Sequence, residues 1–142
     1  MNGYWLRIHT ARLLIAVVAF WNLLAAFQFL TQPALYAPGF ELSGEAGTAM
    51  LRGLGLLFVM WNVPYLFALV NPVRHRISLI ESVIMQFIGA AGETVLLMTL
   101  DGNHPVLHQS VMRFITFDTT GVLLLVIALM LTVRLAKERP EV

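Results

Sequence analysis

The chain has 142 residues, of which 58% are hydrophobic and 12% charged, and its formal net charge is +1. A soluble domain carries about 25% charged residues, so lipid rather than water is the expected solvent of this chain. No run of Lys and Arg interleaves with aromatic residues, and we therefore expect no nucleic-acid partner. The absence of cysteine excludes thiol catalysis, disulfides and cysteine-ligated metal centres.

Four apolar stretches meet the requirement of about 20 helical residues for crossing a bilayer core. In chain order they cover about residues 13–30, 53–70, 77–100 and 111–133. The second helix has a possible earlier start, because Ser43 suits a helix cap and Glu45 suits a first turn. The stretches are too long for strands and lack period-two alternation. We predict an all-α fold with one transmembrane domain, residues 1–142, forming a four-helix bundle.

A cleavable signal peptide is the competing interpretation of the first stretch. Its apolar run is longer than the 7–15 residues that are typical of such a signal, and no small-x-small cleavage motif clearly follows it. We therefore expect the stretch to be retained as a membrane span.

Positive charges flank the predicted spans unevenly. Seven of the nine Lys and Arg residues lie before the first span, between the second and third, or after the fourth, which leaves Arg52 and Arg113 on the other side. Cytoplasmic loops carry an excess of Lys and Arg. The charge pattern therefore predicts that both termini are cytoplasmic.

Three amide side chains share a depth near the middle of the predicted spans. Asn22 and Asn62 each follow a tryptophan, Trp21 and Trp61, and Gln86 reaches a similar level in the third span. Amides at equal depth can hydrogen-bond across a helix interface, for about 0.6–2 kcal/mol each. Two interpretations stay open: a polar clasp between helices, which is favoured, and a midplane site for a lipophilic ligand such as a quinone or a lipid.

Four charged residues form a second layer nearer the opposite face of the membrane. Arg52 and Arg113 begin the second and fourth spans, while Glu93 and Asp118 lie about two turns deep in the third and fourth. An unpaired charge at that depth costs several kcal/mol, roughly, in lipid. We predict a buried network in which each acid pairs with one arginine. Structural pairing is the favoured role, and a proton or anion path is the alternative.

Several glycines and one proline predict how the helices pack. Gly53 and Gly55 in the second span, with Gly89 and Gly92 in the third, allow close helix approach. Pro64 removes a backbone hydrogen bond two residues after Asn62, so a kink is expected there.

The histidines, which could bind a haem or a metal ion, lie outside the predicted spans. All four histidines are in flanks or loops, which argues against a haem held within the membrane. His104 and His108 have the spacing of a metal pair, but Pro105 intervenes and no third ligand is evident. No nucleotide-binding loop or nucleophile elbow occurs. We predict no catalytic residue and no metal, and an enzyme is the less favoured class.

Short motifs in the first 80 residues resemble those of the small four-helix DoxX-like membrane proteins and related uncharacterised bacterial families. They are FLTQP at 29–33, YAPGF at 36–40, LRGLG at 51–55 and NPVRHR at 71–76. The resemblance implies a four-helix bundle in a bacterial cytoplasmic membrane and carries no agreed activity. Some members are linked with quinone or redox partners, but no quinone-site residues can be matched here.

Three functions are compatible with these features. The favoured one is a non-catalytic accessory or structural subunit of a larger membrane complex, or of a homo-oligomer, because the loops are short and no chemistry is evident. The second is a binder of a small lipophilic molecule at the two Trp-Asn pairs. The third is a small proton-coupled transporter that uses Glu93 and Asp118, although the small multidrug exporters carry a Glu in their first span and this chain does not.

Overall fold

The computed structural model describes residues 2–137, with side chains described for residues 3–133. All regular elements within those residues are helices. They are α1 (Asn2–Thr31), α2 (Pro33–Tyr36), the 3-10 helix η1 (Ala37–Phe40), α3 (Gly44–Trp61), α4 (Val63–Val70), α5 (Arg76–Thr99) and α6 (Pro105–Lys137).

Four helical stretches are long and apolar enough to cross a membrane. They are Gly3–Thr31, Gly44–Val70, Arg76–Thr99 and Pro105–Val133. The four predicted stretches fall within them to within one residue, which confirms an all-α chain with four candidate spans and a multi-pass membrane protein. Three of the helices begin well before the predicted apolar cores, because polar residues at a membrane surface extend a helix without needing an apolar environment.

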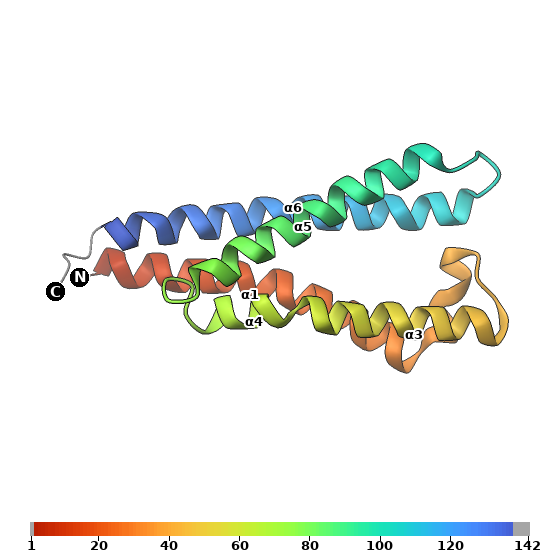
Figure 1. Ribbon diagram of the computed structural model, residues 1–142, viewed down its shortest axis with the longest axis horizontal. Coiled ribbons are helices and arrows are strands. Elements are labelled where there is room, and N and C mark those ends of the chain that lie inside the picture. The colour runs from red at the N-terminus through yellow and green to blue at the C-terminus, as the bar shows by residue number, and fades with distance from the viewer. Residues whose placement is uncertain (1, 138–142) are drawn as a thin grey trace.

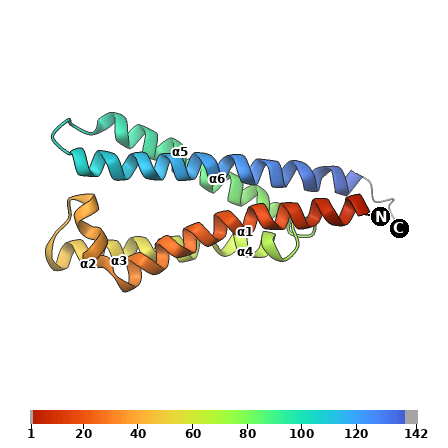
Figure 2. The same cartoon turned by 180° about the vertical axis from the view of Figure 1, so that it is seen from behind.

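The helices fall into two groups that meet at one end of the molecule and separate toward the other (Figures 1 and 2). In one group α5 lies along α6, and in the other α1 packs against α3 and α4; α1 also packs against α6, and α4 against α5. The first turn of α1 and the last turn of α6 lie at the same end. Arg139, one of the charges used to predict the orientation, lies outside the described residues.

Two groups of buried apolar side chains hold the helices together. The inner core lies toward the chain ends and joins α1, α4, α5 and α6 through residues such as Ile15, Leu79 and Leu125. The outer core joins α1, η1 and α3 through Phe29, Ala37 and Leu51. Because lipid is as apolar as these side chains, close packing and hydrogen bonds have to supply the association energy.

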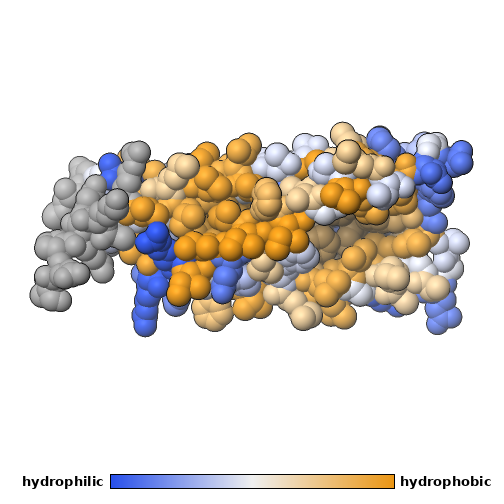
Figure 3. Space-filling model, turned by 45° about the horizontal axis from the view of Figure 1, so that its top comes forward, coloured by the Kyte–Doolittle hydropathy of each residue, from blue (hydrophilic) through white to orange (hydrophobic). Residues whose placement is uncertain are grey.

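The outward-facing surface is strongly apolar. Large hydrophobic residues on all four spans are more than half exposed, among them Phe20, Met60, Ile77 and Met130. Figure 3 shows a broad apolar band between polar groups that gather toward the two ends of the drawn face. This pattern fits helices surrounded by lipid, where an apolar outer face has no cost.

Two of the four expected packing glycines lie at close helix contacts. A β-carbon on Gly55 would lie 3.0 Å from the carbonyl oxygen of Ala26, and one on Gly89 would collide with the Asp118 carboxyl group. A β-carbon on Gly53 or Gly92 would meet nothing within 4 Å. Close approach of helices therefore explains Gly55 and Gly89 but not the other two.

The second span is interrupted at Asn62, between α3 and α4. Pro64 stands in the first turn of α4, where its missing N–H is tolerated. The Asn62 side-chain amide donates to the carbonyl oxygen of Phe58 at 2.7 Å. The interruption occurs where Pro64 predicted a kink.

Candidate functional site

A chain of polar side chains crosses the bundle near the middle of the spans. The buried hydroxyl of Tyr65 on α4 donates to Oε1 of Gln86 on α5 at 2.6 Å and lies 3.2 Å from the carbonyl oxygen of Ser82. Nε2 of Gln86 donates to Oδ1 of Asp118 on α6 at 2.6 Å. Asn22 on α1 lies beside the Tyr65 hydroxyl. The chain therefore links all four spans through hydrogen bonds, which lipid cannot replace.

The three amides of the expected midplane layer are buried, but they do not bond to one another. Asn22 and Gln86 are each 4% exposed and Asn62 is fully buried. Asn62 bonds within its own helix, and its Oδ1 has no hydrogen-bond partner within the described residues. Tyr65 takes the linking position instead. The sequence feature that could have identified Tyr65 is its spacing of three residues from Asn62, which places both side chains on one helix face.

The structure separates the four charges that were expected to form one buried network. The side chains of Arg52 and Arg113 are exposed, and neither forms an ion pair with Glu93 or Asp118 in the described part of the chain. Glu93 lies beside Asp118 instead. Because five residues turn a helix by about 140°, Arg113 and Asp118 were expected to find partners on different helices. Asp118 does reach α5, but its partners there are Gln86 and Glu93, and neither acid pairs with an arginine within the described residues.

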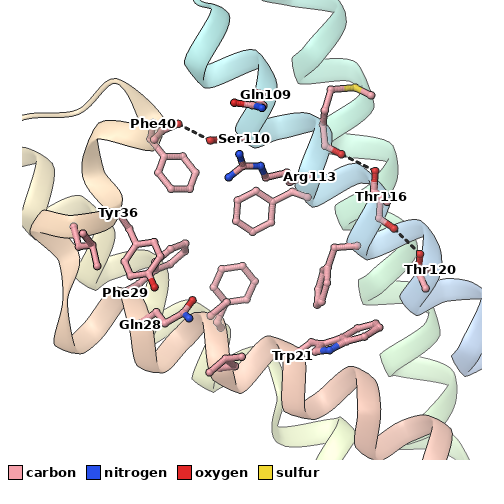
Figure 4. A pocket seen from close by; sticks show the side chains of 18 residues that line it. Trp21, Gln28, Phe29, Tyr36, Phe40, Gln109, Ser110, Arg113, Thr116 and Thr120 are labelled. Atoms are coloured by element: carbon pink, nitrogen blue, oxygen red, sulfur yellow. Dashed lines mark hydrogen bonds between the residues drawn. The ribbon is translucent and has the colours of Figure 1, made fainter.

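A cavity of about 870 Å³ lies between α1 and α6 in the outer half of the bundle, and it is open to the surface. Its walls are formed mainly by aromatic and aliphatic side chains of α1, α2, η1, α3 and α6 (Figure 4). This volume falls within the range of about 300–1,000 Å³ that small-molecule sites occupy, and such sites are also mostly apolar with few polar groups. The cavity is the best candidate for a binding site.

Aromatic contacts hold the cavity wall in place. The ring of Phe29 contacts those of Tyr36, Phe40, Phe58 and Phe114, with centroids 5.7–6.5 Å apart. These contacts join α1, α2, η1, α3 and α6. Aromatic pairs at such distances each contribute about 0.5–1.5 kcal/mol beyond simple burial. The wall is therefore built by packing from several elements and does not depend on a ligand.

The cavity only partly overlaps the ligand site expected from the sequence. Trp21 lines it and contacts Phe117 of α6, with ring centroids 5.6 Å apart and ring planes tilted by 54°. Trp61 packs against the inner core, and Asn22 and Gln86 belong to the polar chain. The structure therefore does not gather the two Trp-Asn pairs around one space.

The outer end of the cavity is held by a clasp between η1 and the start of α6. Oε2 of Glu41 lies 2.5 Å from Nδ1 of His104, and Oε1 accepts from the Leu107 N–H at 3.2 Å. The Ser110 hydroxyl donates to the carbonyl oxygen of Gly39 at 2.5 Å. Both Gly39 and Ser110 line the cavity. These bonds, together with the ring contact between Phe40 and Phe114, fix η1 and the residue that follows it to α6.

The electrostatics of the clasp favour an ionised Glu41. The hydrogen bond to His104, followed by the Leu107 N–H, holds the pKa of the Glu41 carboxyl below its ordinary value of 4.5. Glu41 also has a positive φ of 56°. That conformation is uncommon for residues other than glycine and is kept where surrounding contacts determine it.

The described residues contain no group of three or more His, Asp or Glu side chains placed to hold a metal ion. His104 and His108 have the sequence spacing of a metal-binding pair, but His104 contacts Glu41. Comparison with known proteins found no matching family model, no matching curated protein and no matching solved structure. The cavity and the polar chain are therefore the features of the described residues that bear on function.

Proposed function

We propose that this chain is a non-catalytic multi-pass membrane protein that binds a lipophilic small molecule in the cavity between α1 and α6. The observation that carries the proposal is the cavity itself, with its apolar aromatic walls and a volume of about 870 Å³. The clasp and the aromatic cluster connect the two helix groups at this end and fix the residues that form the cavity wall. The distribution of Lys and Arg supports cytoplasmic termini, and the DoxX-like motifs support a bacterial cytoplasmic membrane.

Mass spectrometry of organic extracts from the purified protein tests the proposal. We expect a lipophilic species in stoichiometric amount that is lost from Ala25→Phe, because Ala25 lines the cavity and phenylalanine would fill it. Ala91→Phe is the matched control, since Ala91 is exposed on α5 and lies outside the cavity. An extract without any bound species, or equal retention by both variants, would contradict a ligand site.

An accessory-subunit role is compatible with ligand binding, and we propose it as the cellular setting. Its support is the broad apolar surface of α3 and α5, which neighbouring membrane helices or lipid would cover. Gentle detergent extraction followed by size analysis tests it. Subunits that co-purify are expected, and a clean monomer or homodimer would count against the role.

A second candidate function is proton-coupled transport. The supporting observation is that Glu93 lies beside Asp118 without an arginine partner, and that Oε2 of Glu93 is buried with no hydrogen-bond partner within the described residues. Two adjacent carboxyl groups that share a proton are one arrangement used for proton exchange. Flux measured in proteoliposomes should fall in Glu93→Gln, and unchanged flux would remove this candidate.

A further inference from the structure

We infer that the cavity accepts a single-chain amphiphile with an acidic head group, whose head is bound by Arg113 and whose tail extends toward Trp21. The inference rests on the proposed function and specifies the chemical class of its ligand. It is argued from charge, from unused hydrogen-bonding groups and from the course of the cavity along α6.

Arg113 is the only charged residue that lines the cavity within the described chain, and it has no ion-pair partner there. Figure 4 shows its guanidinium group pointing from α6 into the cavity, toward Phe40. Glu41 is engaged with His104, and Asp118 with Gln86. A guanidinium group in apolar surroundings favours a bidentate carboxylate or phosphate partner.

Further polar groups lie around the same part of the cavity. Gln109 precedes Arg113 by one helical turn, so both side chains lie on one face of α6. Gln28 and Tyr36 enter from the opposite wall (Figure 4). The side chains of Gln28, Tyr36 and Gln109 have no hydrogen-bond partner in the described residues, although other polar side chains of the bundle do. These donors are available to the oxygens of an acidic head group.

The remainder of the cavity suits an alkyl chain. From Arg113 to Thr120 the α6 side of the cavity extends about 10 Å toward the inner half of the bundle. Along this path Thr116 and Thr120 donate their hydroxyls to the carbonyl oxygens of Met112 and Thr116 (Figure 4). These hydroxyls are therefore satisfied and leave an apolar surface. Trp21, packed against Phe117, lines the far part.

The position of Arg113 favours a role in binding a ligand in the cavity over a role in anchoring the helix at the membrane surface. It lies eight residues, or about 12 Å, beyond the start of α6. An arginine that only anchors a helix extends its side chain to the lipid head groups. Arg113 turns into the cavity instead. Arg52, exposed near the start of the second span and outside the cavity, provides a natural comparison.

The test uses fluorescence quenching in nanodiscs of zwitterionic phosphatidylcholine. Trp5→Phe and Trp61→Phe together leave Trp21 as the sole tryptophan of the chain. The probes are a bromine-labelled fatty acid and the fatty alcohol of the same chain length, because bromine quenches a tryptophan that it contacts. We expect both to quench Trp21 in the Arg113 protein, with the acid binding about tenfold more tightly, since a carboxylate forms stronger, bidentate hydrogen bonds with a guanidinium group than a hydroxyl can.

Arg113→Gln should remove the preference for the acid and leave the affinity for the alcohol unchanged, while Arg52→Gln should keep the preference. Equal binding of acid and alcohol to the Arg113 protein would overturn the inference about the head group while leaving cavity binding intact. Loss of the preference in Arg52→Gln as well would also overturn it, because membrane surface charge would then explain the result. Absence of Trp21 quenching by either probe would contradict the proposed function itself.

Discussion

At the scale of single residues, Tyr65 connects three of the four spans through its hydroxyl group. Its backbone belongs to α4, its hydroxyl donates to Gln86 on α5, and it lies beside Asn22 on α1. Gln86 then continues the chain to Asp118 on α6. Because lipid offers no replacement donor or acceptor, these bonds add to close packing in holding the helices together.

Tyr65→Phe should therefore destabilise the protein. We expect a loss of about 0.6–2 kcal/mol in the free energy of unfolding, since the Gln86 oxygen loses its donor. Unfolding in mixed micelles, followed by circular dichroism, measures the change. Tyr36→Phe is the matched control, because the Tyr36 hydroxyl has no partner in the described residues. Equal stability of the two variants would show that the polar chain does not hold the bundle.

A second prediction at this scale concerns Gly121, where the backbone of α6 lies close to the side chain of Gln86. A β-carbon on Gly121 would lie 2.7 Å from Nε2 and 3.0 Å from Cγ of Gln86. Gly121→Ala should cost about 1–3 kcal/mol, because Gln86 is bonded at both ends and has little freedom to move. The same unfolding assay applied to Gly92→Ala, where nothing lies within 4 Å, is expected to show little change. A stable Gly121→Ala protein would argue against this close crossing.

The sequence predicted which polar side chains would turn inward, but not which would meet. Asn22, Asn62 and Gln86 are buried because exposure to lipid is costly at their depth. Depth along a span is readable from residue counts, whereas the rotation and tilt of each helix depend on contacts with its neighbours. For this reason Glu93 and Asp118 were each expected to pair with an arginine, and instead they lie beside each other.

At the element scale, the structure of the connection from α1 to α3 could not be predicted from the sequence. Pro33 and Pro38 marked a break, but α2, η1 and their packing against α6 depend on contacts between distant segments. Ser110, for example, lies 71 residues from Gly39, whose carbonyl oxygen accepts its hydroxyl. The cavity forms at this connection, which is why its residues, apart from Trp21, were missed as ligand contacts.

The clasp at this connection should weaken in acid. Glu41 has a lowered pKa in the folded chain, so its contribution is fully present above the unfolded value of 4.5. As the pH falls below 4.5 the unfolded chain takes up the proton first, and the stabilisation is lost as the pH passes through the lowered folded pKa. Hydrogen exchange at the Leu107 amide should accelerate over this range.

Glu41→Gln should exchange faster at neutral pH and lose this pH dependence, because glutamine carries no titrating carboxylate. Glu45→Gln is the control, since Glu45 lies in the first turn of α3 and its side chain forms no hydrogen bond or ion pair with α6 within the described residues. If both variants kept the original profile, the Glu41 carboxylate would not be what holds Leu107.

At the scale of the whole molecule, four spans require that the connections alternate between the two faces of the membrane. The chain has no cysteine, so single cysteines can be introduced without background labelling. We expect Arg74→Cys to react only with a reagent that reaches the cytoplasm and Asn103→Cys to react from outside intact cells. Labelling of both positions from the same side would contradict the topology.

The asymmetry of the bundle is its main feature at this scale: tight apolar packing near the chain ends, a polar chain near the middle of the spans, and an open aromatic cavity toward the α1–α3 and α5–α6 connections. A side-chain-resolution density map of the protein in a lipid nanodisc tests this account most directly. We expect four membrane-crossing helices and elongated density between Arg113 and Trp21. A map with α6 packed tightly onto α1 and α3 along its length, leaving no cavity, would contradict the account.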